Sequence, residues 1–193
     1  MEQAPRQPAV IRRVHLPDAQ AMQEFLVGLS GASRRYRFHG AVNGVSPSLL
    51  RRLVDADGER HAAWVACVWG ANGEEIVGEA VWYVVDEARA SAELAISVSD
   101  AWHGQGVADE LMRTLVRAAR ESGLRELYGD VFNANGRMLA FMRRHGMEPG
   151  VCDPPDDADI VRLGCLFASA QSVAGGLATR HESWWARLLS RWY

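Results

Sequence analysis

The 193-residue sequence predicts an α+β domain with a mixed central sheet and helices on both of its faces. Helical periodicity dominates the first third of the chain after one short strand, and three apolar runs joined by short polar turns follow it. Strand and helix then alternate towards the C-terminus. The hydrophobic fraction of 48% and the charged fraction of 23% are those of an ordinary globular protein. The length suits one domain with a sizeable core.

The N-terminal third is predicted to contain a strand and three helices. Residues 1–8 are polar and are expected to form a disordered leader, and residues 9–14 form the first strand. Pro17–Asp18 opens the first helix, because proline is tolerated in a first turn and an acid there complements the helix dipole. Ser33 is predicted to cap a second, short helix, and Ser46 is predicted to start the third.

The middle of the chain is predicted to form an antiparallel meander. Apolar runs cover residues 62–69, 76–85 and 91–98. Turn signals separate these runs at residues 71–74 and 86–90. Because short polar turns join consecutive strands, neighbouring strands are expected to run in opposite directions.

The most regular helix of the sequence is predicted over residues 105–122. Apolar side chains recur there every four residues, acids lie early and arginines lie late, and Gly123 follows as a terminating glycine. A strand over 126–132, a helix over 135–144 and a strand over 159–167 complete the expected domain. That domain therefore spans residues 9–167.

The C-terminal end is predicted to lie outside the domain. Residues 168–179 are small, polar and rich in glycine, which is typical of a linker. Residues 180–193 carry tryptophans and leucines at spacings of three and four, so they predict a Trp-rich amphipathic tail. Two interpretations stay open: the tail packs on its own domain or a second subunit, or it docks on a membrane surface or another protein.

The composition argues against several classes of function. A net charge of −3 gives no strong field to attract nucleic acid, and the basic segment 34–37 reads either as a local patch or as a solvated helix face. No stretch approaches the roughly 18–20 apolar residues of a membrane helix. The dispersed cysteines have neither CxxC nor zinc spacing and suit a reducing cytoplasm. We therefore expect a cytoplasmic protein without a metal, a nucleic-acid partner or membrane association. The cysteines are Cys67, Cys152 and Cys165.

One turn of the sequence carries chemistry. Gly104 and Gly106 lie between the end of a predicted strand and the start of the strongest helix. Glycines let the backbone approach a phosphate closely, and the first N–H groups of a helix lack intrahelical partners. Together they predict an anion site suited to a pyrophosphate. The Lys and Ser/Thr of a P-loop are absent, and the glycines are too few for a dinucleotide fingerprint.

The run from His103 to Ala108 (HGQGVA) resembles the motif of the GNAT N-acetyltransferase superfamily, which reads Gln or Arg, two residues, Gly, one residue, then Gly or Ala. His103 departs from the first position. Residues 131–147 resemble the second conserved block, in which Asn135 opens a helix beside the coenzyme. Residues 33–38 (SRRYRF) resemble a subgroup related to bacterial protein lysine acetyltransferases. The resemblance covers residues 9–167.

The resemblance implies a GNAT fold, with a mostly antiparallel sheet splayed at the acyl-CoA site. It also implies transfer of an acetyl group from acetyl-CoA to a primary amine, on a protein lysine or a small molecule, without a metal. A homodimer or a contact through the tail stays possible. The implied cofactor-binding residues are Ile96, Ser97, Val98, His103, Gly104, Gln105, Gly106, Val107, Ala108 and Asn135.

The general base is predicted to be Glu93. Strand alternation places it on the face opposite to Leu94. It lies a few residues before the turn at residues 103–108, called the coenzyme turn below. The resembling subgroup carries a Glu at the matching position and uses it as base. The other interpretation of Glu93 is a surface or ion-paired acid of the strand. Glu79, on the neighbouring strand, is then the reserve candidate for the base.

The tyrosine that serves many family members as general acid is replaced by Met142. Tyr83 and Tyr128 are weaker substitutes, and water can also protonate the leaving thiolate. This departure and that of His103 support an alternative function, that of a catalytically silent acyl-CoA-binding sensor or recruitment module. The acidic, Pro-containing stretch 153–159 is either part of the acceptor side, where it would suit a cationic amine, or a solvated loop.

Overall fold

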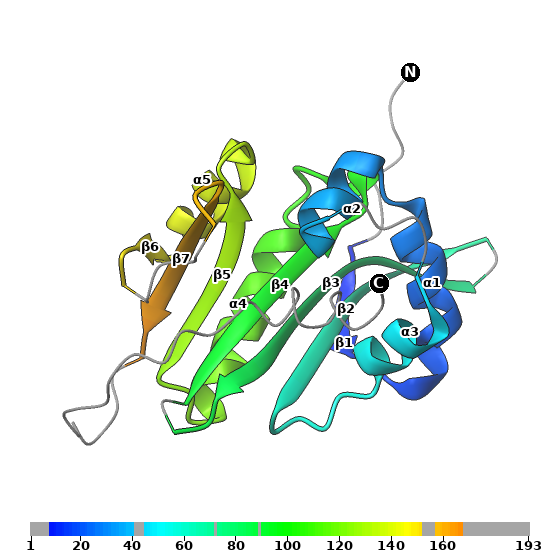
Figure 1. The fold of residues 1–193 in the computed structure, drawn as a ribbon. Helices are drawn as coiled ribbons and strands as arrows, with labels where there is room; N and C mark the ends of the chain where they lie inside the picture. Colours follow the sequence, from blue (N-terminus) through cyan, green and yellow to red (C-terminus); the bar gives the residue numbers. More distant parts are fainter. Residues whose placement is uncertain (1–7, 41–44, 72, 89, 152–156, 168–193) are drawn as a thin grey trace.

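A single seven-stranded sheet organises the computed structural model, which describes the chain except for residues 1–7, 41–44, 72, 89, 152–156 and 168–193 (Figure 1). The strand order is β1-β2-β3-β4-β5-β7-β6. Every pairing between these strands is antiparallel except that of β4 with β5, which is parallel. The strands are β1 (Val10–Arg13), β2 (His61–Gly70), β3 (Gly73–Asp86), β4 (Ser91–Val98), β5 (Glu126–Phe132), β6 (Glu148–Pro149) and β7 (Ile160–Leu166).

Helices cover both faces of the sheet, as the sequence predicts for this α+β class (Figure 1). The helices α4 and α5 pack on one face, and α1 to α3 pack on the other. The helices are α1 (Ala19–Gly28), α2 (Gly31–Phe38), α3 (Pro47–Val54), α4 (Val107–Glu121) and α5 (Gly136–Arg144), with short 3-10 turns η1 (Leu16–Asp18) and η2 (Asp100–Trp102). No helix among the described residues has the length and apolar character needed to cross a membrane.

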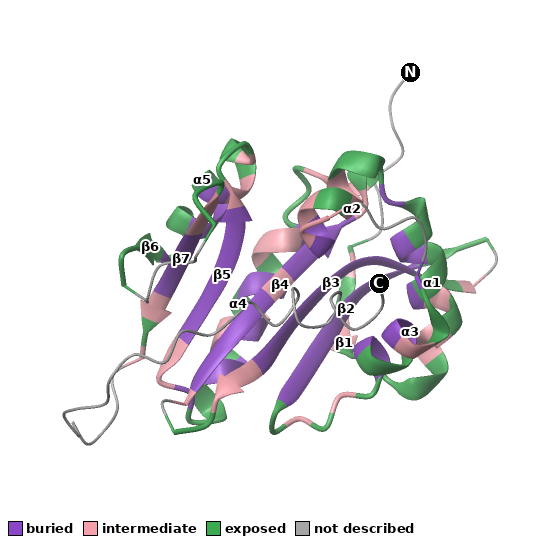
Figure 2. Cartoon of the chain, in the orientation of Figure 1, coloured by how far each residue is buried: buried purple, intermediate pink, exposed green. Residues whose placement is uncertain are grey.

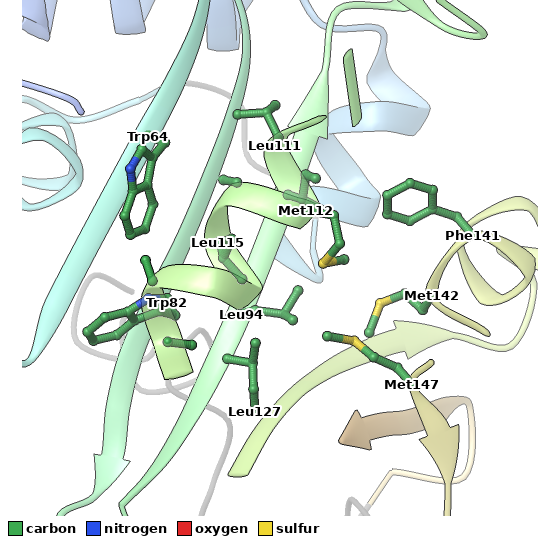
Figure 3. Packing of buried hydrophobic residues seen from close by; sticks show 14 of the residues in the cluster. Trp64, Trp82, Leu94, Leu111, Met112, Leu115, Leu127, Phe141, Met142 and Met147 are labelled. Carbon is green, nitrogen blue, oxygen red and sulfur yellow. The ribbon is translucent and has the colours of Figure 1, made fainter. Parts of the chain in front are cut away.

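The side chains of the strands alternate between two hydrophobic cores. On β4, Leu94 belongs to the core under α4 and α5, whereas Ala95 packs against the core under α1 to α3. This alternation confirms the faces predicted for the strand. Strands β2 to β5 are accordingly buried along most of their length (Figure 2). Fully burying one large apolar side chain stabilises the fold by about 1.5–3 kcal/mol. Large members of the first core, shown in Figure 3, are Trp64, Trp82, Leu94, Leu111, Met112, Leu115, Leu127, Phe141, Met142 and Met147.

Besides shifts of one to three residues at other strand and helix ends, the predicted elements need three corrections. The cap of α2 is Ser30, whose hydroxyl accepts a hydrogen bond from the N–H of Ser33, the residue expected to be the cap. Helix α4 begins at Val107 and not at residue 105, because Gly106 has a left-handed φ of 81° that helical geometry excludes. The short strand β6 was not expected; two residues give too weak a pattern to predict. The expected leader (except Pro8), linker and tail lie outside the described residues, as does most of the acidic stretch 153–159.

Candidate functional site

The sheet opens between β4 and β5. These strands pair at only three positions, the last of which joins Glu93 to Tyr128. Beyond that pair the two strands separate, and a cavity of about 550 Å³ lies there. Its walls include Leu94–Val98 of β4 and Gly129–Phe132 of β5. The remaining walls come from α2, from the segment that leads into the first turn of α4, and from α5 along most of its length.

Backbone N–H groups of β4 face this opening. The N–H of Ser99 donates to the carbonyl oxygen of Val77 on β3 at 2.8 Å. Because N–H directions alternate along a strand, the N–H groups of Ile96 and Val98 point away from β3 and towards β5. Both residues line the cavity. The strand therefore presents fixed donors that can polarise a carbonyl placed in the opening.

The turn from His103 to Ala108 lies at the mouth of the cavity, where α4 begins. Gly104 and Gly106 have left-handed φ values of 73° and 81°, and a Cβ at either position would meet nothing within 4 Å. The backbone conformation, and not crowding, therefore requires glycine. No side chain caps the first turn of α4. Its N–H groups remain available to an anion.

His103 connects this turn to α5. Its Nε2 lies 2.9 Å from the carbonyl oxygen of Val98, and its Nδ1 lies 2.9 Å from Nη1 of Arg137. Arg137 lines the cavity and was not named from the sequence; its one signal is its place two residues after Asn135. Asn135 caps α5 by accepting from the N–H of Met138 at 3.2 Å, and it lines the cavity as well.

Helix α2 forms another wall of the cavity, and Asp100 holds its N-terminal end. The carboxylate of Asp100 accepts from the N–H and the hydroxyl of Ser30 at 3.0 Å each and from the hydroxyl of Ser33 at 2.9 Å. Burial alone would raise the pKa of Asp100, but these hydrogen bonds outweigh it and hold the pKa below its ordinary value. The residues next to the coenzyme turn thus also anchor α2.

A buried ion pair fixes the far end of α2. The Nε of Arg37 donates to Oε1 of Glu79 at 2.5 Å, and both side chains are almost fully buried. The hydroxyl of Ser97 donates to the same oxygen at 3.1 Å. Glu79, the reserve base, is therefore engaged with Arg37 and does not line the cavity.

Glu93 lies at the closed end of the opening. It is 1% exposed, and the lining of the cavity begins at the next residue, Leu94. After burial, the charge of Glu93 is the largest influence that raises the pKa of the neighbouring Tyr128 hydroxyl. Glu93 and Gln105 are the two predicted site residues that do not line the cavity; Gln105 donates instead to the carbonyl oxygen of Ala101 at 2.8 Å.

Tyr36 and His39 are among the protonatable groups of the cavity that sequence reasoning missed. Both lie on or just after α2, in a segment that the sequence marked as basic and as part of the family resemblance, without assigning either residue to the site. The Nε2 of His39 lies 2.9 Å from the carbonyl oxygen of Asp130, so this nitrogen donates and Nδ1 keeps its lone pair. Burial lowers the pKa of His39 below its ordinary value.

The expected acid position is apolar. Met142 is 1% exposed and lines the cavity, so the wall offers no proton there. Tyr83 and Tyr128 are buried and do not line it, which leaves Tyr36 as the phenol of the cavity among the described residues. The ring of Tyr36 packs against Phe132 with centroids 6.1 Å apart. Within the described ranges, no group of three or more His, Cys, Asp or Glu side chains could hold a metal ion.

Comparison with known proteins identifies relatives over most of the chain. The model of the acetyltransferase (GNAT) family matches residues 33–147. An acetyltransferase of Pseudomonas aeruginosa, PA5475, is 31% identical over 152 residues, which cover 79% of this chain and 81% of that protein.

Solved structures share the fold. The GNAT domain of the S. lividans PAT superposes with a TM-score of 0.75 at 24% identity, covering 82% of this chain and 90% of that one. The yncA protein of Salmonella typhimurium, solved with its cofactor acetyl-CoA, gives a TM-score of 0.66 at 16% identity and covers 88% of this chain and 100% of that one. A phosphinothricin acetyltransferase of Sinorhizobium meliloti, in complex with AcCoA, gives 0.67 at 17% identity, with 89% and 96% covered.

Proposed function

Since this chain belongs to the acetyltransferase (GNAT) family, we propose that it moves an acetyl group from acetyl-CoA to a primary amine, on a protein lysine or a small molecule. One observation carries the proposal. The opening between β4 and β5 leads from strand N–H groups, suited to a thioester, to a glycine turn at a helix N-terminus, suited to a pyrophosphate. Two relatives of the same fold contain acetyl-CoA, which supports this assignment.

The coenzyme is proposed to lie along the turn and the opening. The first N–H groups of α4 would bind its pyrophosphate, with Gly104 and Gly106 allowing close approach. The N–H groups of Ile96 and Val98 would bind the thioester oxygen and stabilise the negative charge that develops on it. Asn135 would border the pantetheine arm from the start of α5.

The acceptor amine is proposed to enter beside α2. Its nitrogen attacks the thioester carbon, the C–N bond forms, and the C–S bond then breaks to release the CoA thiolate. The amine must lose a proton, and we assign Glu93 as the general base that accepts it. Glu93 lies at the closed end of the opening and does not line it, so the proton would travel through a water molecule. The thiolate takes a proton from water or from Tyr36.

The assignment of the base is tested by Glu93→Gln. We expect kcat/KM to fall at least 100-fold, because general base catalysis contributes about 10²–10⁴, while the Kd for acetyl-CoA stays unchanged. Initial rates of thiol release and calorimetric binding measure the two quantities. Glu126→Gln, on β5 and outside the cavity lining, is the matched control and should keep full activity.

A parallel measurement on His39 tests whether that residue, and not Glu93, is the general base. His39 lines the cavity and keeps a lone pair on Nδ1. Full turnover in Glu93→Gln together with a large loss in His39→Gln would contradict the role of Glu93 and assign it to His39.

A sensor without catalysis is the second candidate function, and Met142 is the observation that favours it. A panel of amines and proteins, assayed for thiol release from acetyl-CoA, separates the two functions. Turnover with any acceptor supports the transferase. Saturable binding of acetyl-CoA without turnover across the panel supports the sensor.

A further inference from the structure

Arg137, at the start of α5, is held by His103, the residue that departs from the family motif. His103 stands where the motif has Gln or Arg, and its Nδ1 accepts from Nη1 of Arg137 at 2.9 Å. The two residues are 34 positions apart in the sequence, and both line the cavity. The pair therefore joins the coenzyme turn to α5 across the mouth of the cavity.

The imidazole of His103 is oriented by its two contacts. A carbonyl oxygen only accepts, so Nε2, at 2.9 Å from the Val98 oxygen, carries the hydrogen. An arginine only donates, so Nδ1 is the acceptor for Arg137. Both contacts are satisfied by the neutral ring in a single tautomer. The end of β4 thus fixes the orientation of the His103 ring, and this ring fixes the position of the Arg137 guanidinium.

The charge of Arg137 is available to a ligand. Within the described residues its hydrogen-bond partner is an imidazole, whereas two other arginines of the cavity face carboxylates. Arg37 pairs with Glu79 at 2.5 Å, and Arg144 lies 4.0 Å from Asp109. Arg137 is also exposed, so an anion can reach its remaining N–H groups.

We propose that Arg137 binds a phosphate group of the acyl donor and that His103 is its positioning residue. The positive charge that an arginine at the first motif position would supply comes here from α5, and His103 holds it at the turn. This inference rests on the proposed function, because it needs an acyl-CoA in the cavity. Guanidinium–phosphate contacts are charge-assisted and often bidentate, so one such contact has a measurable effect on affinity.

The test measures the Kd of three donors by calorimetry: acetyl-CoA, acetyl-3′-dephospho-CoA and S-acetylpantetheine, which has no phosphate. We expect Arg137→Gln to weaken acetyl-CoA about tenfold and to leave S-acetylpantetheine within twofold. An equal loss with the dephospho donor assigns the contact to the pyrophosphate, and a loss confined to acetyl-CoA assigns it to the 3′-phosphate. Arg143→Gln, an exposed arginine of the same helix outside the cavity lining, should change nothing.

The positioning role of His103 is tested by a double-mutant cycle. We expect His103→Ala to weaken acetyl-CoA binding nearly as much as Arg137→Gln, but by less than twofold when Arg137 is already Gln. His103→Gln should restore part of the affinity, since an amide also offers one donor side and one acceptor side.

Three results would overturn the inference. The first is acetyl-CoA affinity within twofold of wild type in Arg137→Gln. The second is an equal loss with S-acetylpantetheine, and the third is additive losses in the cycle. Absence of acetyl-CoA binding by the wild-type chain would overturn the proposed function as well, which separates that failure from these three.

Discussion

His61, at the start of β2, couples folding to pH at the scale of a single residue. The residue is 7% exposed, and its ring stacks on that of Tyr83 with centroids 4.0 Å apart. Burial lowers its pKa from 6.5 to about 4, although a contact with the carbonyl oxygen of Asp55 acts in the opposite direction. The folded state therefore resists protonation of this ring.

The sign of the effect on stability follows from linkage. Below pH 6.5 the unfolded chain takes up a proton that the folded chain does not, so the free energy of unfolding falls as the pH falls from 6.5 to 4. The full effect is about 3 kcal/mol. Urea unfolding between pH 7.5 and 4 measures it. We expect His61→Phe to lose the part of this dependence that His61 contributes and to keep that of His39, whereas His15→Gln, at an exposed position, should keep the full dependence. Identical pH slopes in wild type and His61→Phe would contradict the prediction.

Single residues of the site were predictable from sequence where a local motif carries them. The glycines of the turn and Asn135 at a helix start follow from local patterns, whereas the replacement by Met142 follows from the family resemblance. Tyr36, His39 and Arg137 were not predicted, because the walls of the cavity come together only on folding: His103 and Arg137 are 34 residues apart, and Ser30 and Asp100 are 70 apart. Local patterns do not encode such contacts.

At the scale of the element, the attachment of α2 decides the shape of the acceptor wall. The helix has eight residues, which is too short for stability in isolation, so its contacts hold it. Those contacts are the bonds of Asp100 at its N-terminus and the buried pair of Arg37 with Glu79 near its end. Asp100 follows β4, which borders the opening, and Glu79 lies on β3, which pairs with β4.

Breaking the buried pair should destabilise the protein more than removing it. Arg37→Met leaves the carboxylate of Glu79 buried beside an apolar side chain, and we expect a loss of about 3–5 kcal/mol in the free energy of unfolding. The double variant Arg37→Met with Glu79→Leu should recover part of this loss, because no buried charge remains. Denaturant unfolding of both variants gives the comparison. A double variant less stable than Arg37→Met would contradict this account.

The same scale shows where sequence patterns succeed. Strands β4 and β5 have the predicted bounds, because both are runs of β-forming residues between clear turn signals. The start of α4 was predicted two residues early, because apolar spacing does not register a left-handed glycine. The parallel pairing of β4 with β5 and its end after Glu93 depend on the whole sheet; the family resemblance implied the splay, and residue spacing did not.

At the scale of the molecule, the opening leaves the sheet with few backbone pairs between β4 and β5, a junction called the seam below. Two half-sheets meet at three residue pairs, and the cavity occupies the remaining length of the strands. A donor bound there would contact both halves. Acetyl-CoA is therefore expected to stabilise the whole domain and not only the turn.

Thermal unfolding tests this expectation. At 100 times its Kd a ligand that binds only the folded state adds about 2.7 kcal/mol, which for a chain of this size raises Tm by about 5–10 °C. ADP at the same concentration is the control, since it has a pyrophosphate but no pantetheine arm to span the seam. A rise with ADP equal to that with acetyl-CoA would contradict a ligand that bridges both halves.

The four residues from Asp100 to His103 have a practical meaning for changing the specificity of this protein. Asp100 anchors α2, and His103 orients Arg137, so one short segment supports the walls for both substrates. A mutant library aimed at new amines should keep this segment and the Arg37–Glu79 pair unchanged. Diversity belongs instead at Ala32, which lines the cavity from α2 and takes no part in either anchor or in the proposed proton transfers.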